Sequence, residues 1–307
     1  MIDETPFWTL EEVIQRATDP VVVISTESVA DLVESSLSFP VVTDFHLLPK
    51  DVTTLIVVGG GTMMDAAKIM SLNDGFDVIA IPSVWGSGAE VSPISVFTEN
   101  GEKKHIMDDR LLPMARSSIP GLVERLSESL VQYGCGDAWS HAVEGSVSPL
   151  GILESRATGA ALMNEMLEVG LKRDEQWFDF SARACLLQAS TGVGLIHGIA
   201  HTLEPILGTG QSDGGWGHAR LCSTILWPVF DRFIRDTEKW QSFTSEHMVD
   251  ESAISATLHS LFNRDDYLAI RPHLIEAWKL ILRHPLTRIN CSLVRSGDIA
   301  RFTEDIV

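Results

Sequence analysis

The first third of the chain alternates short hydrophobic runs with longer segments of mixed character. Four of the runs are rich in β-branched residues: Val21 to Ile24, Val41-Val42, Leu55 to Val58 and Val78 to Ile81. Near-continuous apolar runs of this length favour strands that are buried on both faces, as in a parallel sheet covered by helices. The pattern therefore predicts an α/β domain with a parallel sheet.

After about Gly121 the chain changes to long amphipathic segments with few strand-like runs. Their apolar positions recur with helical spacing. The predicted helical segments include Leu122 to Leu130, Ala157 to Leu171, Ser181 to Leu195 and Pro272 to Leu282. Pro120-Gly121 interrupts any continuing element. We therefore expect an α/β domain at residues 1–120 and an all-helical domain at residues 121–307.

The length and the net charge of the chain limit the classes of function that it can have. A chain of 307 residues exceeds the usual size of one hydrophobic core, which agrees with two domains that share a cleft. The net charge of −19 opposes binding to nucleic acid or to anionic membranes. The start of the chain lacks the features of a signal peptide, and no apolar run reaches the about 18 residues of a membrane helix. These features predict a cytoplasmic protein with a small-molecule substrate.

Cysteine spacing excludes one kind of metal site. The four cysteines are far apart and form no CxxC pair: Cys135, Cys185, Cys222 and Cys291. This distribution argues against both a zinc ribbon and a disulfide framework. The cysteines are predicted to be buried thiols.

A glycine-rich turn follows the third apolar run. Gly59-Gly60-Gly61-Thr62 lies between Leu55 to Val58 and a helix-like segment. Glycines let a backbone approach a pyrophosphate closely, and the N-terminus of the next helix offers N–H donors and a favourable dipole. Three successive glycines favour a phosphate-binding turn over a plain connection, although the spacing differs from the GxGxxG fingerprint.

Histidines and a carboxylate recur at helical spacing in the second half. Asp137 and His141 are four positions apart, as are His197 and His201, and His218 follows a glycine-rich turn. Residues four apart lie on one face of a helix. Aspartate with neutral imidazoles suits a divalent iron, zinc, manganese or nickel ion.

The residues alone leave a second interpretation open, since any single histidine is more often an ordinary core or surface residue. The two spaced pairs favour a metal, because buried polar groups need a shared partner. Glu144 is predicted either to lie on the helix surface or to support a metal ligand. The remaining histidines show no such pairing and are assigned no site: His46, His105, His247, His259, His273 and His284.

Taken in order, these motifs resemble the iron-containing alcohol dehydrogenase family, in a shortened form with a dehydroquinate synthase-like fold. The resemblance is carried by Gly59 to Lys68 and by Ile81 to Ser92. Asp137 to Glu144 resembles the family's DAxxHAxE helix, and His197 to His201 its HxxxH element, which His218 follows. The similarity runs from about Val21 to Phe230.

The resemblance implies a dinucleotide-binding domain followed by a metal-binding domain, and it implies roles for individual residues. The implied metal ligands, for Fe²⁺ or Zn²⁺, are Asp137, His141, His197 and His218. His201 would be the catalytic residue beside the nicotinamide and substrate. The implied cofactor contacts are Gly60, Gly61, Thr62, Asp65, Ser83, Val84, Ser87, Ser92 and Lys103. If Thr26 takes the place of the acidic residue that follows the first strand, NADP(H) becomes possible beside NAD(H).

The sequence departs from the family in three places. The chain passes from Pro49 to Leu55 without the helix that the family inserts there. Val84 and Trp85 replace small or hydroxylated residues in the cofactor segment, where an indole would either crowd the nicotinamide or remodel the pocket. His197 and His218 are separated by a long connection, so a loop that includes Thr209 to Gly215 is predicted to have grown beside the metal.

The implied reaction is hydride transfer between a nicotinamide and a small aldehyde or alcohol, catalysed by a homodimer. One alternative is a metal- and NAD-dependent cyclase or lyase similar to dehydroquinate synthase. Another is a scaffold that keeps the metal and has lost cofactor binding. Neither a lysine-rich polyol site nor decay of the implied ligands is evident in the sequence.

Overall fold

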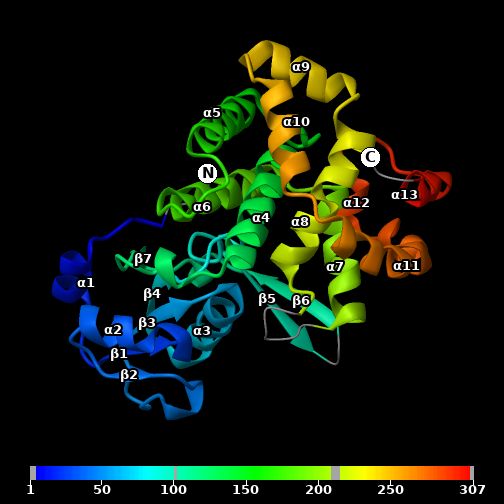
Figure 1. Cartoon of the computed structure of the whole chain (residues 1–307). Helices are drawn as coiled ribbons and strands as arrows, with labels where there is room; N and C mark the ends of the chain where they lie inside the picture. The colour runs from blue at the N-terminus through cyan, green and yellow to red at the C-terminus, as the bar shows by residue number, and fades with distance from the viewer. Residues whose placement is uncertain (1–4, 100–101, 209–214, 305–307) are drawn as a thin grey trace.

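The computed structural model describes residues 5–99, 102–208 and 215–304. An α/β unit comes first, drawn blue to cyan in Figure 1, and a helical unit lies beside it. The elements of the α/β unit are α1 (Leu10–Arg16), β1 (Val21–Ser25), η1 (Glu27–Val29), α2 (Ala30–Ser36), β2 (Val41–Val42), η2 (Phe45–Leu47), β3 (Thr54–Gly59), α3 (Gly61–Asp74), β4 (Asp77–Pro82), β5 (Ile94–Glu99), β6 (Glu102–Met107), η3 (Asp109–Leu111) and β7 (Ala115–Arg116).

The main sheet is parallel and has the strand order β2-β1-β3-β4-β7. Its register pairs Val23 with Ile56 and Ile56 with Ile79. Every residue of β1 and β3 is buried, because helices cover both faces of the sheet and the β-branched side chains fill the space beneath them. The four apolar runs thus form strands, which confirms the predicted α/β fold. Only the short turn η2 lies between β2 and β3, so the expected missing helix is indeed absent from this connection.

A two-stranded antiparallel hairpin, β5 and β6, was not predicted from the sequence. A buried lysine attaches it to α3: Lys68 Nζ donates to the carbonyls of Ala89, Ser92 and Ile94 at 3.0, 3.1 and 2.7 Å. Beside it, Asp65 Oδ2 accepts from the Val96 N–H at 3.1 Å. A buried ammonium needs several such partners, so this cluster fixes the base of the hairpin.

The helical unit contains η4 (Val123–Arg125), α4 (Glu128–Val147), α5 (Leu153–Val169), α6 (Gln176–Thr191), α7 (Leu195–Leu207), α8 (His218–Val229), η5 (Phe230–Ile234), α9 (Glu238–His247), α10 (Glu251–Ser260), α11 (Arg264–Ile281), α12 (Pro285–Arg288), η6 (Ser296–Ile299) and α13 (Ala300–Thr303). Among the described residues, no helix is both long enough and apolar enough to cross a bilayer. The domain boundary at residues 120 and 121, which lies between β7 and η4, stays a prediction.

Two predicted helices are wrong in their limits. The segment from Leu122 to Leu130 is not one helix: η4 ends in an extended residue, Leu126, and α4 starts anew where the Ser127 hydroxyl accepts from the Leu130 N–H. Likewise, α6 ends at Thr191, because Gly192 takes a positive φ of 75° and breaks the helix before α7. Local caps, which the apolar periodicity does not record, set these ends.

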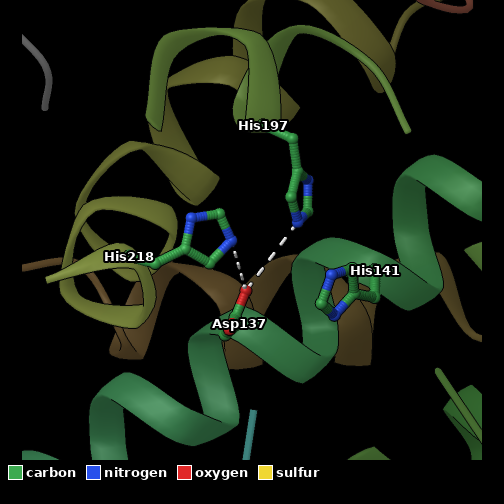
Figure 2. Close-up of side chains that lie close together, drawn as sticks. All are labelled: Asp137, His141, His197 and His218. Carbon is green, nitrogen blue, oxygen red and sulfur yellow. Dashed lines mark ion pairs between the residues drawn. The ribbon is translucent and has the colours of Figure 1, made fainter. Parts of the chain in front are cut away.

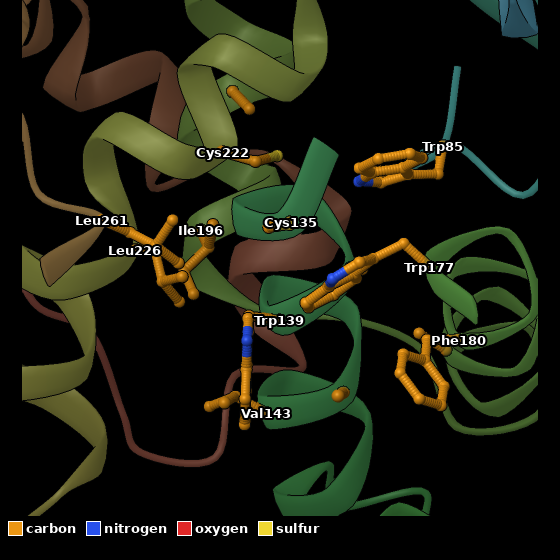
Figure 3. Packing of buried hydrophobic residues seen from close by; sticks show 14 of the residues in the cluster. Trp85, Cys135, Trp139, Val143, Trp177, Phe180, Ile196, Cys222, Leu226 and Leu261 are labelled. Atoms are coloured by element: carbon orange, nitrogen blue, oxygen red, sulfur yellow. The ribbon is translucent and has the colours of Figure 1, made fainter. Parts of the chain in front are cut away.

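Helix α4 runs through the middle of the helical unit, and every residue from Gly134 to Val147 is buried. At Gly136 the neighbouring helix α8 comes so close that a Cβ would stand 2.4 Å from the Ser223 side chain. Figure 3 shows the core around α4, where Trp85 from the α/β unit packs beside Trp177. All four cysteines are free thiols, and only Cys291 is partly exposed.

Candidate metal and cofactor sites

Four side chains from three helices converge on one point (Figure 2). Asp137 and His141 come from α4, His197 from α7, and His218 is the first residue of α8. Each offers one ligand atom, and these atoms all lie within 4.8 Å of one another. Asp137 Oδ1 stands 3.8 Å from His197 Nε2 and 3.7 Å from His218 Nε2. The structure therefore brings together the four residues that the resemblance named as ligands.

Several buried polar atoms at the centre of this cluster have no hydrogen-bond partner among the described residues. Asp137, His141 and His197 are 1, 4 and 2% exposed. Both Asp137 carboxylate oxygens and His197 Nε2 are buried without a hydrogen-bond partner among the described residues. Leaving such groups unpaired is costly, and a shared divalent cation would satisfy all of them. One carboxylate and three imidazoles are a donor set that iron and zinc both accept, so the residues present fit a metal ion.

Electrostatics prepares these groups to act as ligands. Burial lowers the pKa of His141 to about 3, and the neighbouring His197 and His218 act in the same direction. The imidazole is therefore neutral near pH 7, as a metal ligand must be. Burial raises the pKa of Asp137, but the three facing histidines outweigh it and hold that pKa below its usual value.

Two buried carboxylates stand behind the imidazoles. Glu144 Oε2 lies 2.8 Å from His197 Nδ1, and its Oε1 accepts from the Ile196 N–H at 2.7 Å. Glu144 is 3% exposed, so the surface interpretation was wrong and the supporting one agrees with the geometry. A carboxylate at Nδ1 leaves the opposite nitrogen, Nε2, free to face the metal.

Glu204 is the carboxylate that the sequence analysis missed. It is 3% exposed, and its Oε2 lies 3.8 Å from His218 Nδ1. The sequence did contain a signal for Glu204. It lies seven positions after His197, which places both residues on the same face of α7. Acidic side chains in apolar helices are expensive to bury, and this cost marks them as candidate site residues.

His201 stands at the partly exposed edge of the cluster. Its ring centroid is 5.0 Å from that of His218 and 5.7 Å from that of His284. His284, to which the sequence assigned no site, therefore lies beside the predicted catalytic histidine. No sequence spacing could have revealed it, because it belongs to the cap of α12, far along the chain.

The glycine turn has the predicted strand–turn–helix form. Gly59 ends β3, and Gly60 caps α3 without a side-chain hydrogen bond. Thr26 N–H donates to Val58 O at 3.3 Å, and Ser83 N–H donates to Gly59 O at 3.0 Å. The ends of β1, β3 and β4 therefore meet at one edge, where open parallel sheets bind their ligands.

The other implied cofactor residues are distributed around this edge. Thr62 and Ser87 are exposed near the start of α3, and Val84 packs against Gly60. The Ser92 hydroxyl accepts from the Ile94 N–H at 3.1 Å. The structure places the Asp65 carboxylate at the hairpin, and the predicted role of Lys103 stays a prediction. The Asp65 carboxylate is held by Lys68 at 3.2 Å and by the hairpin. Lys103 pairs with Thr98 in β6, and its side chain lies outside the described residues.

A single loop, Ser83 to Ser92, links the glycine turn to the metal cluster. In its middle, Ser87 faces the glycine turn, since a Cβ on Gly61 would stand 2.7 Å from Ser87 Oγ. The adjacent Gly86 faces the metal cluster: it has a positive φ of 125°, and a Cβ there would stand 3.1 Å from Asp137 Oδ2. Both approaches need glycine, so the loop holds the two candidate sites side by side.

Trp85 corrects one expectation. Its indole is 3% exposed and makes an edge contact with Phe178 at 5.3 Å, on the side of the helical unit. It therefore fills the core between the two units instead of the space above the glycine turn. The predicted enlarged loop, Thr209 to Gly215, lies outside the described residues except for Gly215.

A parallel α/β unit with a glycine turn, joined to a helical unit with a buried Asp–His cluster, defines a two-part fold with a candidate metal site. Comparison with known proteins makes the class specific. Residues 46–116 match the family model described as iron-containing alcohol dehydrogenase. The match covers only this part of the chain, and there it confirms the resemblance seen in the sequence.

The chain is 35% identical over 95 residues to maleylacetate reductase of Pseudomonas knackmussii, a match that covers 31% of this chain and 27% of that protein. The chain therefore spans little more than a quarter of that relative's length in the match.

Solved structures are similar over almost the whole fold. An iron-containing alcohol dehydrogenase from Corynebacterium glutamicum aligns with a TM-score of 0.77 at 18% identity, covering 98% of this chain and 94% of that one. A sulfoacetaldehyde reductase from Bifidobacterium kashiwanohense in complex with NAD⁺ aligns with a TM-score of 0.76 at 18% identity, covering 97 and 96%. At 18% identity these structures show that the chain shares their fold.

Proposed function

We propose that the protein is a metal-dependent, NAD(P)-linked alcohol dehydrogenase or aldehyde reductase that acts on a small aldehyde or alcohol by hydride transfer. The observation that carries this proposal is the Ser83 to Ser92 loop, whose adjacent residues Gly86 and Ser87 approach Asp137 and Gly61. Hydride transfer requires the nicotinamide and the substrate carbon to be held in contact. A glycine turn and a metal cluster joined by one loop supply that proximity.

In this proposal Asp137, His141, His197 and His218 hold Fe²⁺ or Zn²⁺. When bound, the metal supplies a Lewis acid that polarises the substrate oxygen. Glu144 keeps the His197 ring oriented through Nδ1, so that Nε2 stays on the side of Asp137. The burial of the three α4 and α7 side chains excludes water from the inner face of the site.

The cofactor would lie along the edge formed by the ends of β1, β3 and β4. Gly60 and Gly61 would receive the pyrophosphate at the start of α3. Thr26, whose backbone is fixed by Val58, would lie near the ribose, where the lack of a carboxylate permits a 2′-phosphate. The proposed cofactor is therefore NAD(H) or NADP(H). Only NADP(H) carries the 2′-phosphate, which would lie near Thr26.

His201 is proposed to exchange the substrate proton with solvent. Its imidazole is partly exposed and lies beside His218, at the mouth of the buried cluster. Imidazole accepts and releases protons near neutral pH, which suits reduction and oxidation alike.

The proposal is tested by supplying the metal-loaded protein with reduced nicotinamide that carries deuterium at C4 and with a panel of small aldehydes. Transfer of deuterium to the carbonyl carbon, lost in the Asp137→Asn variant, is the expected result. A protein that binds both metal and nucleotide yet transfers no deuterium to any aldehyde would contradict the proposal.

A further inference from the structure

A histidine that the proposed function does not use lies beside His201. The ring of His284 makes an edge contact with the ring of His201, with 5.7 Å between their centroids. His201 makes a similar contact with His218 at 5.0 Å. The three imidazoles form a row that starts at the metal cluster, and His284 is the last of them. His284 therefore lies where the part of a bound substrate that is far from the metal would be.

The cap of α12 decides which ring nitrogen of His284 carries the proton. His284 is the N-cap residue of this helix, and its Nδ1 accepts from the Leu286 N–H at 3.3 Å. A neutral imidazole that accepts at Nδ1 is protonated at Nε2 and donates from there. Among the described residues, His284 Nε2 has no hydrogen-bond partner, so this N–H is available to a ligand.

The surroundings of His284 keep its ring neutral and place it near a further imidazole. Burial lowers the pKa of His284, and His105 on β6 acts in the same direction. Strand β6 contacts α7, so His105 approaches the row from the side of the hairpin (Figure 1). An anion beside these rings would offset the unfavourable charge interaction between them.

Acidic groups of the protein do not take this place. Glu144 and Glu204 are the carboxylates that stand behind the metal cluster, and they contact Nδ1 of His197 and Nδ1 of His218. His284 forms no ion pair with a carboxylate in the part of the chain that the structure describes. An acidic group at His284 Nε2 would therefore have to come from the ligand.

We propose that His284 binds the far end of the substrate, and that this end carries a carboxylate. The substrate would thus be an aldehyde acid, with its aldehyde oxygen at the metal cluster and a carboxylate oxygen that accepts from His284 Nε2–H. A hydrogen bond to a charged acceptor is stronger than one to a neutral acceptor, so this donor selects acids over neutral aldehydes of the same length. The inference rests on the proposed function, because it takes aldehyde reduction at this cluster as given.

The test compares pairs of unbranched aldehydes of equal length, in which one member carries a terminal carboxylate. In at least one pair the wild-type protein should have the higher kcat/KM for the acid. His284→Asn should reduce the ratio of kcat/KM for the acid to that for its neutral partner by about 10–100-fold, the usual range for one hydrogen bond to a charged group. Asparagine is a good N-cap residue, so this variant keeps the cap of α12 while it loses the ring N–H.

Two further variants separate the charge effect from a general loss of structure. His284→Asp also caps a helix well, but its carboxylate would repel that of the substrate, so the ratio should fall below that of His284→Asn. His46→Asn, at an exposed position in the α/β unit, is the matched control and should keep the wild-type ratio.

A second measurement reports binding without turnover. Succinate, glutarate and adipate are added in turn to the zinc-loaded protein, and nitrogen-15 spectra of the histidine side chains are recorded. At least one of these diacids should shift the Nε2 resonance of His284, which is assigned by its absence from the His284→Asn spectrum.

Three results would overturn the inference and leave the proposed function intact. They are a wild-type protein that reduces each neutral aldehyde at least as well as its acid partner, a His284→Asn variant with an unchanged ratio, and a His284 resonance that none of the diacids shifts. A wild-type protein that binds metal and nucleotide and reduces no aldehyde of either kind would instead overturn the proposed function, and the inference with it.

Discussion

His197 is constrained from both of its ring nitrogens. Glu144 holds Nδ1 at 2.8 Å, and Nε2 faces Asp137 at 3.8 Å. The two contacts place a ligand nitrogen at the centre of the cluster before any ion arrives. A site that is preorganised in this way gains affinity, because little side-chain freedom is lost on binding.

Replacing His197 by alanine should abolish stoichiometric metal binding. The substitution removes one of three imidazoles and leaves the buried Glu144 Oε2 without its hydrogen-bond partner. Metal content is measured on purified, metal-reconstituted protein, with circular dichroism to check the fold. A folded variant that keeps one metal per chain would refute the assignment of His197 as a ligand.

Glu144→Gln should bind metal about 10–100-fold more weakly, the usual cost of losing an outer carboxylate. The amide keeps the size of the side chain but does not favour the Nδ1–H form of His197. Chelator competition with Zn²⁺ gives the affinity. Glu246→Gln, at an exposed position on α9, is the matched control and should change nothing. Equal affinities for the two variants would show that Glu144 does not support the metal.

The sequence singled out Asp137 with His141 and His197 with His201, because each pair lies within a single helix, where the spacing of four is visible. Glu204 and His284 were not assigned to the site, since each meets a histidine of the cluster through packing between helices. A spacing rule describes one element, and it does not report which faces of two elements meet.

At the scale of elements, the contact between α4 and α8 positions the site. Asp137 and His141 are on one helix and His218 is on the other, so the distance between the helices sets the ligand distances. Gly136 permits that distance.

Gly136→Ala should separate α4 from α8 and lower the free energy of unfolding by about 1–3 kcal/mol, the usual cost of overpacking a core. A Cβ there would stand 2.4 Å from the Ser223 side chain and 2.7 Å from its Cα. The affinity for the metal should also fall, because the ligands on α4 and α8 would move apart. Gly297→Ala meets nothing within 4 Å and is the control. Denaturant unfolding and chelator competition measure both effects, and an unperturbed Gly136→Ala protein would contradict the packing described.

Tyr267 joins α11 to the end of the chain, where its hydroxyl donates to Phe302 O at 2.8 Å. Burial raises the pKa of Tyr267 from 10.0 to about 12. Between these two values the unfolded chain loses the phenol proton while the folded protein keeps it, so stability falls as the pH rises. Tyr267→Phe should lose about 1 kcal/mol at neutral pH and show a shallower alkaline decline. Thermal unfolding from neutral to alkaline pH tests this, and parallel curves for the two proteins would contradict it.

The strands could be predicted from the sequence where burial on both faces determined which residues they contain. The strands β1, β3 and β4 are buried on both faces, so their sequences are almost entirely apolar. The hairpin β5–β6 is polar and partly exposed, and β7 has two residues, so neither produces a recognisable pattern. The hairpin is held instead by Lys68, a buried charge that binds the segment leading into β5 through backbone carbonyls, and such contacts leave no pattern in the sequence.

At the scale of the whole molecule, the Ser83 to Ser92 loop and Trp85 join the two units. The loop contacts both candidate sites, and the indole packs between the units beside Trp177 and Phe178. A nucleotide at the edge of the sheet and a metal among the helices would therefore share one rigid support. The account requires that the same molecule bind both.

That requirement is tested most directly by titrating the metal-reconstituted protein with NADH and, separately, with NADPH, while nicotinamide fluorescence and the metal content of the same sample are measured. We predict about one metal per chain, as a single catalytic site implies, and saturable binding of at least one of the two nucleotides. One metal per chain with no binding of either nucleotide would contradict the account.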